Sequence, residues 1–441
     1  MQWITFLYKP FLVILYAQTK SNKSMQMKKL CTLLIALLMA QSIFAQISNE
    51  TFTSGKTGKR QKLGLYKPTG YTDKKVYPLI VVLNANTLME PVVTAVRYYE
   101  QFEEMPKCIV VGVYDEKLEE VAIIDEVGRP MNESARFFDF ISTELVPYIQ
   151  GKYPIAAFKG IIASEEAGFL INYYLLNPKS PFSMYVSLNP TVIPRMAPEF
   201  AAALATGASK EQHRLYYYMA TADVENKLSY DKTINFEKGL RSMPIHESVL
   251  YRFADMKGSS VNSAKLQGIA QALDECFDIY KPIGGKEYKT QMETLSNNIF
   301  EYLENKYNTI EQYIGLKKKP LLNDVMATYT AIKSAADWES LRKLAKYVET
   351  NGYVKTAMPN FFLAEYYEKT EDYKKALKTY QKSYTEPSID FITADLITER
   401  INALKTNRNV GRPSKKSKKV IEEVPETTDE QTTPTDESNQ N

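Results

Sequence analysis

Short runs of apolar residues alternate with amphipathic stretches through the central part of the chain. Six runs stand out, and they cover residues 78–85, 107–114, 159–164, 184–190, 215–222 and 247–254. Each run has the length of a strand, and most of its positions are apolar rather than alternately apolar and polar. This pattern predicts strands that are buried on both faces of a sheet.

Several of the segments between these runs show helical spacing instead. Within residues 134–153, apolar side chains recur on one face of a helix, at Phe137, Phe138, Ile141, Leu145 and Ile149. Strands that alternate with helices predict an α/β fold. We therefore expect a doubly wound, mostly parallel sheet that is covered by helices on both faces.

From residue 286 to residue 405 the pattern is helical throughout, and it is best defined over residues 361–387. Small residues there would let two helices approach, and large residues would fill the space between them. The positions concerned are Leu363, Ala364, Tyr367, Ala376, Tyr380, Ser383 and Pro387. Their spacing resembles a tetratricopeptide repeat, although another helical hairpin would share part of it. Helical segments at 337–352 and 392–405 suggest a short array, which implies a protein or peptide partner.

The N-terminus reads as a targeting signal. From Met27 the chain has two lysines, an apolar run and small residues that end at Ala45, as in a secretory signal peptide cleaved after Ala45. We interpret residues 1–26 as an extension from a start codon assigned too early. The apolar run is too short to span a bilayer comfortably. We expect export to the periplasm or the cell exterior, with no transmembrane anchor after removal of the signal.

The other end of the chain is polar. Residues 406–441 are first basic and then acidic, rich in Thr and Pro, and nearly without apolar side chains. Such a segment buries too little surface to offset the entropy of ordering, so we expect a disordered tail. The predicted organisation is a signal with its extension (1–45), an α/β domain (46–285), a helical domain (286–405) and this tail.

Composition excludes several classes of function. A net charge of +3 with 24% charged residues gives no reason to expect nucleic acid as a partner. The chain has two histidines and no Cys-x-x-Cys motif, so we expect neither a metal site nor another cofactor. After signal removal two cysteines remain, Cys108 and Cys276. They are able to form one disulfide in an oxidising compartment, but the apolar run around Cys108 favours a buried thiol.

The order of these strands and helices resembles the esterase D-like branch of the α/β-hydrolase superfamily over residues 61–277. Two parts carry most of the resemblance. One is the helix with Glu144, Pro147, Tyr148 and Ile149, and the other is the strand, turn and helix of residues 161–176. The resemblance implies an α/β-hydrolase fold and, at the turn, the position of a catalytic nucleophile.

In that family the nucleophile is the serine of a Gly-x-Ser-x-Gly turn. Glycines flank the serine because the tight, strained turn leaves no room for large side chains there. Here Ala163 and Ala167 occupy the two glycine positions, and Glu165 stands at the apex. Ser164 does not replace the missing serine. A shift by one position would place Ile162 and Glu166 at the two tight sites.

The base position of the family also differs in chemical type. It follows the last strand, where this chain has Lys257 instead of a histidine. His213 and His246 precede strands, so we expect them at the opposite edge of the sheet. For the acid position, after the run at 215–222, the resemblance leaves Asp223 and Glu225 as alternatives.

The oxyanion-hole positions implied by the resemblance are Ala85 and Glu166. With neither a serine nor a histidine in place, we expect an inactive esterase-like domain that serves as a binding or scaffold component of the cell envelope. Its former cleft would accept a small molecule or a polymer, and Glu165 would form an ion pair with Lys257. The alternative is a hydrolase of a siderophore, sugar or cell-wall ester, with Glu165 as an unconventional nucleophile.

Overall fold

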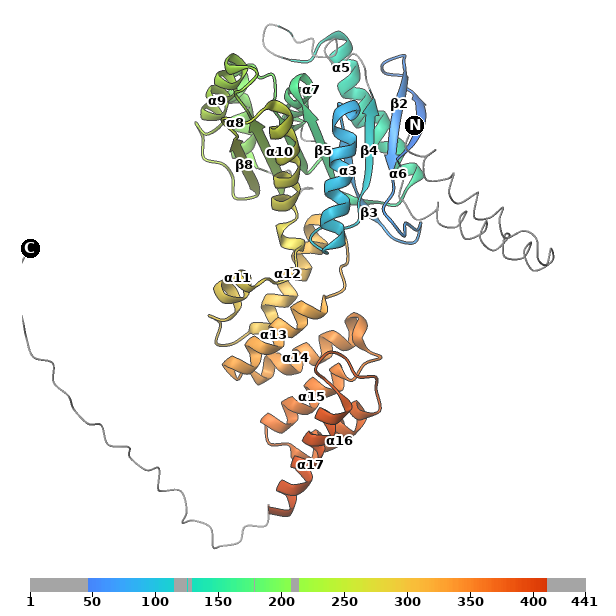
Figure 1. Ribbon diagram of the computed structural model, residues 1–441, viewed down its shortest axis with the longest axis vertical. Coiled ribbons are helices and arrows are strands. Elements are labelled where there is room, and N and C mark those ends of the chain that lie inside the picture. Colours follow the sequence, from blue (N-terminus) through green and yellow to red (C-terminus); the bar gives the residue numbers. More distant parts are fainter. Residues whose placement is uncertain (1–46, 115–124, 126–128, 178, 208–213, 411–441) are drawn as a thin grey trace, which may run out of the picture. The chain divides into compact units, whose positions relative to one another are not determined.

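The computed structural model describes residues 47–114, 125, 129–177, 179–207 and 214–410 (Figure 1). The predicted signal, most of the predicted tail and His213 lie outside these residues. The chain divides into two compact units between Ala335 and Ala336. The first unit thus includes the helices that precede Ala335, whereas the sequence pattern placed the start of the helical domain at residue 286.

The first unit is built on an eight-stranded sheet with the order β1-β2-β4-β3-β5-β6-β7-β8. The strands are β1 (Ser48–Thr53), β2 (Arg60–Tyr66), β3 (Tyr77–Val82), β4 (Ile109–Tyr114), β5 (Ile155–Ser164), β6 (Met184–Leu188), β7 (Leu215–Thr221) and β8 (Val249–Asp255). Strands β3 to β8 run parallel to one another, while at one edge β1 pairs antiparallel with β2, and β2 pairs antiparallel with β4. All six predicted strands are confirmed, and the mostly parallel α/β-hydrolase sheet is the predicted one.

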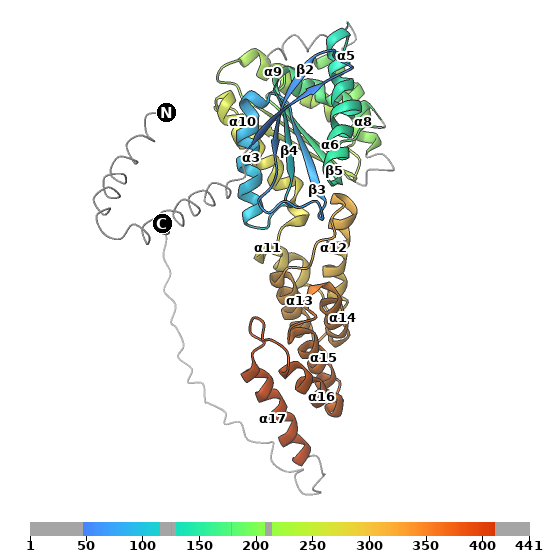
Figure 2. The same cartoon turned by 90° about the vertical axis from the view of Figure 1, so that its right-hand side faces the viewer.

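Helices cover both faces of this sheet. They are α3 (Ala85–Gln101), α5 (Asn132–Asp139), the π-helix η1 (Phe140–Leu145), α6 (Val146–Lys152), α7 (Glu165–Leu170), η2 (Ile171–Leu176), η3 (Pro194–Met196), α8 (Ala197–Thr206), α9 (Lys227–Leu240) and α10 (Val261–Cys276). In Figure 2, α3 and α10 lie on one side of the sheet, and α5, α6 and α8 lie on the other. The strands are buried on both faces for this reason.

The antiparallel edge was not predicted from the sequence. Strand β1 has mostly exposed positions, and its polar residues give no continuous apolar run. The loop between β1 and β2 is held by Glu144, one of the residues that carry the esterase resemblance. Its carboxylate accepts hydrogen bonds from the Ser54 hydroxyl at 2.6 Å and from the Lys56 backbone N–H at 3.1 Å. The helical motif therefore fixes the edge of the sheet.

After α10 the first unit continues with short turns and two longer helices. These elements are η4 (Asp278–Tyr280), α11 (Gly285–Glu287), η5 (Tyr288–Met292), α12 (Ile299–Ile314) and α13 (Leu322–Ala335). Asp324 of α13 is fully buried. It accepts hydrogen bonds from the Ile283 backbone N–H at 2.7 Å and from the Tyr307 hydroxyl of α12 at 2.8 Å. One carboxylate thus connects three segments.

The second unit is all-helical. It contains α14 (Trp338–Val348), η6 (Glu349–Tyr353), α15 (Met358–Lys369), α16 (Tyr373–Tyr384) and α17 (Ala394–Val410). The predicted hairpin at 361–387 is confirmed as α15 packed on α16, with Ala364, Ala376 and Ser383 fully buried. Helix α17 reaches Val410, so residues 406–410 are helical rather than part of the predicted disordered tail.

Among the described residues, no helix combines the length and the apolar character that crossing a membrane requires.

Candidate functional site

The predicted turn after β5 has the backbone of a nucleophile elbow. Strand β5 ends at Ser164, and α7 starts at Glu165, whose φ of 54° lies in the left-handed region. A side chain with a Cβ rarely adopts this conformation, which costs about 1 to 2 kcal/mol. Ala163 and Ala167 are buried beside it, as the tight turn requires. The turn therefore has a strained apex residue, and that residue carries a carboxylate.

Glu165 is bound to a residue that the sequence did not single out. The Lys265 Nζ of α10 lies 2.6 Å from the Glu165 Oε1. The Lys265 side chain is 10% exposed, whereas that of Glu165 is 44% exposed. The Lys265 ammonium is therefore largely shielded from water, and the Glu165 carboxylate accepts its hydrogen bond.

The predicted ion pair between Glu165 and Lys257 is wrong. Lys257 follows β8 as expected, but its side chain is exposed, and its backbone N–H donates to Asp255 at 3.2 Å. Lys265 contacts Glu165 instead. It follows Lys257 in the sequence and belongs to α10, the helix that packs against β6 and β7. Lysine at a helical position usually faces solvent, so sequence alone gave no signal for this contact.

The two candidates for the acid position both bind the loop that follows β8. The Asp223 carboxylate accepts the Gly258 backbone N–H at 2.7 Å, and the Glu225 carboxylate accepts the Val261 N–H at 2.7 Å. The acid and base positions of the family are thus brought together, at the carboxyl ends of parallel strands. Both carboxylates are occupied by backbone donors.

The two oxyanion positions also lie at this edge of the sheet. Ala85 begins α3, directly after Asn84, whose φ of 54° is again left-handed. The Asn84 side-chain oxygen accepts the Ser164 backbone N–H at 3.1 Å, which ties the end of β3 to the elbow. Glu166 follows the apex, and its carboxylate accepts the Thr191 hydroxyl at 3.0 Å. These contacts fix the backbone around the turn.

The described histidine and the two cysteines are remote from this chemistry. His246 precedes β8, so it lies at the amino ends of the parallel strands and not at the carboxyl ends, where the elbow is. Its Nδ1 lies 2.8 Å from the Ser248 hydroxyl. Cys108 and Cys276 are both free and buried. Burial raises the pKa of each thiol well above its usual value, so both remain protonated.

In the part of the chain that the structure describes, no three His, Cys, Asp or Glu side chains gather as a metal site would require.

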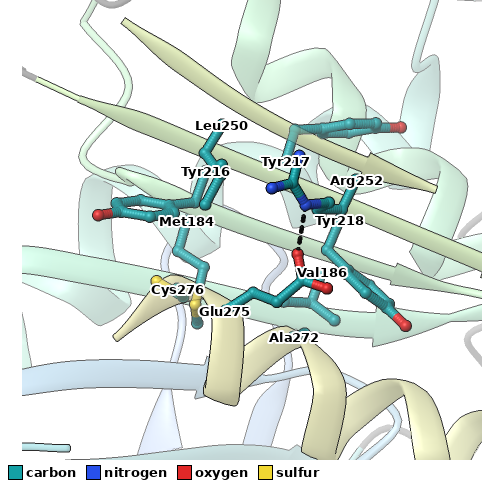
Figure 3. A pocket seen from close by; sticks show the side chains of 10 residues that line it. All are labelled: Met184, Val186, Tyr216, Tyr217, Tyr218, Leu250, Arg252, Ala272, Glu275 and Cys276. Atoms are coloured by element: carbon teal, nitrogen blue, oxygen red, sulfur yellow. Dashed lines mark ion pairs between the residues drawn. The ribbon is translucent and has the colours of Figure 1, made fainter. Parts of the chain in front are cut away.

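A small hollow beside Cys276 has no room for a ligand. Figure 3 shows it between β6, β7, β8 and α10, with Tyr216 and Tyr218 among its lining. Its volume of about 10 Å³ admits one water molecule at most. The Arg252 Nε lies 2.6 Å from the Glu275 carboxylate across it. We assign this hollow to packing.

Comparison with known proteins gives the context of this arrangement. Residues 54–255 match the family model described as "Putative esterase". A crystal structure of an uncharacterised protein from Capnocytophaga ochracea is 72% identical, with a TM-score of 0.78, and the match covers 82% of this chain and 100% of that one. No curated protein matches significantly.

A second solved structure agrees in fold. It is an IroE-like serine hydrolase from Shewanella oneidensis, 15% identical, with a TM-score of 0.52 over 69% of this chain and 99% of that one. At this identity the likeness concerns the fold alone. The chain belongs to the same family as the Capnocytophaga protein, and it consists of an esterase-family α/β-hydrolase domain followed by a helical C-terminal region.

Proposed function

We propose that the esterase-family domain of this protein is catalytically inactive and that the protein is a binding or scaffold component of the cell envelope. The observation that carries the proposal is the ion pair between Glu165 and Lys265. It occupies the apex of the elbow, where a hydrolase of this fold needs a nucleophile and an adjacent base.

The chemistry at the apex supports inactivity. A serine hydroxyl becomes nucleophilic when a neighbouring base removes its proton. Ser164 is adjacent to the apex in sequence, but its side chain is fully buried and no described group accepts a hydrogen bond from its hydroxyl. Asp223 and Glu225, which would orient a histidine, instead hold backbone N–H groups.

A fluorophosphonate probe tests this proposal. We expect no covalent labelling of the wild-type chain under conditions that label an active serine hydrolase in the same mixture, because Ser164, the serine next to the apex, is fully buried and its hydroxyl has no hydrogen-bond partner among the described residues. Mass spectrometry of the intact protein gives the readout. A phosphonylated serine in the first unit would contradict the proposal.

The alternative is a hydrolase in which Glu165 is the nucleophile, and the strained backbone at Glu165 favours it, since strain concentrates at functional sites. Glu165 would add to the ester carbonyl carbon, and the alcohol would leave with a proton from the Lys265 ammonium. Water would then hydrolyse the resulting anhydride while the Lys265 amine takes up a proton. A siderophore, sugar or cell-wall ester would be the substrate.

The scaffold role rests on the helical unit and on the expected export. The buried small residues of the hairpin α15–α16 fit a tetratricopeptide-like repeat, and the Ser383 hydroxyl donates to the Ala357 carbonyl at 2.8 Å. We propose that this short helical array contacts a protein or peptide partner. The former active-site cleft would bind a small molecule or polymer, in the periplasm or at the cell exterior.

A further inference from the structure

Helix α16 of the second unit carries a row of lysines on its exposed side. Lys374, Lys378 and Lys382 are four residues apart, so they follow one another along one face of the helix. All three are exposed, and none of them forms an ion pair with a described residue. Lys375, by contrast, is already paired, with its Nζ 2.7 Å from the Asp372 carboxylate. The row therefore presents three ammonium groups that are free to bind carboxylates.

Exposed apolar side chains lie beside this row. Tyr373 and Tyr384, at the two ends of α16, are 44% and 53% exposed, and Leu377 between them is half-buried. Spacings of four and seven residues place these three on one side of the helix. Lys374 and Lys378 directly follow Tyr373 and Leu377, so the two rows are neighbours and together form what we call the α16 face. A segment that fits this face would carry carboxylates interleaved with apolar side chains.

The end of the chain has this composition. Seven carboxylates lie between Glu422 and Glu437, and no lysine or arginine follows Lys419. The Val and Ile side chains of residues 411–441 lie among the first of these carboxylates, and they are Val420, Ile421 and Val424. We call residues 420–441 the acidic segment. It complements the α16 face both in charge and in apolar character.

The acidic segment begins within reach of the α16 face. Helix α17 packs on α16 and ends at Val410 (Figure 1). Residues 411–419 connect Val410 to the acidic segment and span up to about 30 Å when extended. Helix α16, with 12 residues, is only about 18 Å long. The connection is therefore long enough for the acidic segment to reach any part of the face.

We propose that the acidic segment binds the α16 face of its own chain. Its carboxylates accept hydrogen bonds from the lysines of the face, and its Val and Ile side chains cover the exposed tyrosines. Exposed ion pairs are individually weak, so the contact depends on the tether, which holds the segment at an effective concentration of about 1 mM. An acidic partner of the helical unit has to displace the segment first. The proposal is independent of whether the elbow is catalytic.

Zero-length cross-linking of the wild-type chain with a carbodiimide tests the proposal, because the reagent joins a carboxylate to an amine only where the two are in contact. Trypsin releases the acidic segment as one peptide, and mass spectrometry identifies the lysines joined to it. We expect the three lysines of the α16 face, with far fewer cross-links at about 1 M salt than at about 0.15 M, since salt screens exposed charges. A peptide joined only to lysines of residues 415–419, or only to lysines elsewhere, would overturn the proposal.

An equal mixture of ¹⁵N-labelled and unlabelled chains shows whether the contact forms within one chain. We expect each cross-linked pair to carry a single label, because the tether favours the segment of the same chain. Mixed-label pairs at the level of random pairing would mean that the acidic segment binds a second copy, and this result would contradict the proposal.

A dye-labelled peptide of residues 420–441, followed by fluorescence anisotropy, shows whether the α16 face is already occupied. The variant with Glu422→Gln, Glu423→Gln and Glu426→Gln weakens the chain's own segment, so its face should accept the peptide. We expect a Kd of about 0.1 mM there and about tenfold weaker binding to the wild-type chain, whose own segment competes at about 1 mM. Equal affinity for the two chains would mean that the segment does not occupy the face.

Two double variants in the same background locate the site. Lys378→Glu with Lys382→Glu should weaken peptide binding at least about tenfold, because two attractive contacts become repulsive. Lys346→Glu with Lys355→Glu makes the same change of charge at exposed lysines outside α16. We expect it to alter binding less than about twofold, since salt screens charges more than about 10 Å away. An equal loss in both double variants would reflect net charge alone and would reject the α16 face as the site.

Discussion

Glu165→Ala is expected to lower the free energy of unfolding by about 2 to 3 kcal/mol, and Lys265→Met by only about 1 kcal/mol. The asymmetry follows from exposure. Without Glu165 the Lys265 ammonium is left 10% exposed and without its carboxylate, whereas without Lys265 the half-exposed Glu165 carboxylate turns to water. Removing one partner of a fully buried pair costs about 3 to 5 kcal/mol, and partial exposure reduces this cost. Urea unfolding of the two variants measures the difference.

The double variant Glu165→Ala with Lys265→Met provides the decisive control. It leaves no buried charge, so its stability should equal that of Lys265→Met within about 0.5 kcal/mol. Glu166→Gln, at the neighbouring position, should cost less than about 1 kcal/mol, because its carboxylate accepts a single hydrogen bond from Thr191. Additive costs of the two single changes at positions 165 and 265 would mean that the two side chains do not interact.

Asp324→Ala is expected to have the largest effect on stability, about 4 kcal/mol. The carboxylate is fully buried, and its loss leaves the Ile283 backbone N–H and the Tyr307 hydroxyl without their acceptor. Each orphaned buried donor costs about 1 to 3 kcal/mol, and the missing side chain adds a cavity. Thermal unfolding measured by circular dichroism gives the change in stability.

Asp324→Asn separates shape from charge at this position. The amide keeps one oxygen for the Ile283 N–H, and the Tyr307 hydroxyl is able to rotate and accept, so we expect a loss of about 1 to 2 kcal/mol. Asp231→Ala removes an exposed carboxylate of α9 that pairs with Lys227, and it should cost under about 0.5 kcal/mol. An Asp324→Ala variant as stable as Asp231→Ala would refute the role of this network.

The sequence predicted most of the α/β architecture because buried parallel strands leave continuous apolar runs. The runs at 159–164 and 215–222 became β5 and β7, and the small residues Ala163 and Ala167 predicted the tight turn. The edge strand β1 was not predicted, because a mostly exposed six-residue strand with many polar residues has the sequence pattern of a loop. The sequence also did not indicate that the first unit extends to Ala335. Asp324 has the sequence pattern of an exposed acidic residue in a helix, and only the structure shows that it is buried.

For the candidate site, the sequence indicated positions along the chain but no contacts. The resemblance pointed to Glu165, to Asp223 or Glu225, and to Lys257, and in the structure these residues follow the parallel strands β5, β7 and β8. The partner of Glu165 was not predictable, because Lys265 is 100 residues away along the chain and differs from a solvent-facing lysine only by its burial.

Hydrolysis of short-chain p-nitrophenyl esters by the wild-type chain and by Glu165→Ala tests the central claim most directly. If the ion pair between Glu165 and Lys265 has replaced the catalytic chemistry of the elbow, both proteins will release p-nitrophenol at the uncatalysed rate. A wild-type rate clearly above that background, and lost in Glu165→Ala but not in Glu166→Gln, would contradict the claim and establish Glu165 as a nucleophile.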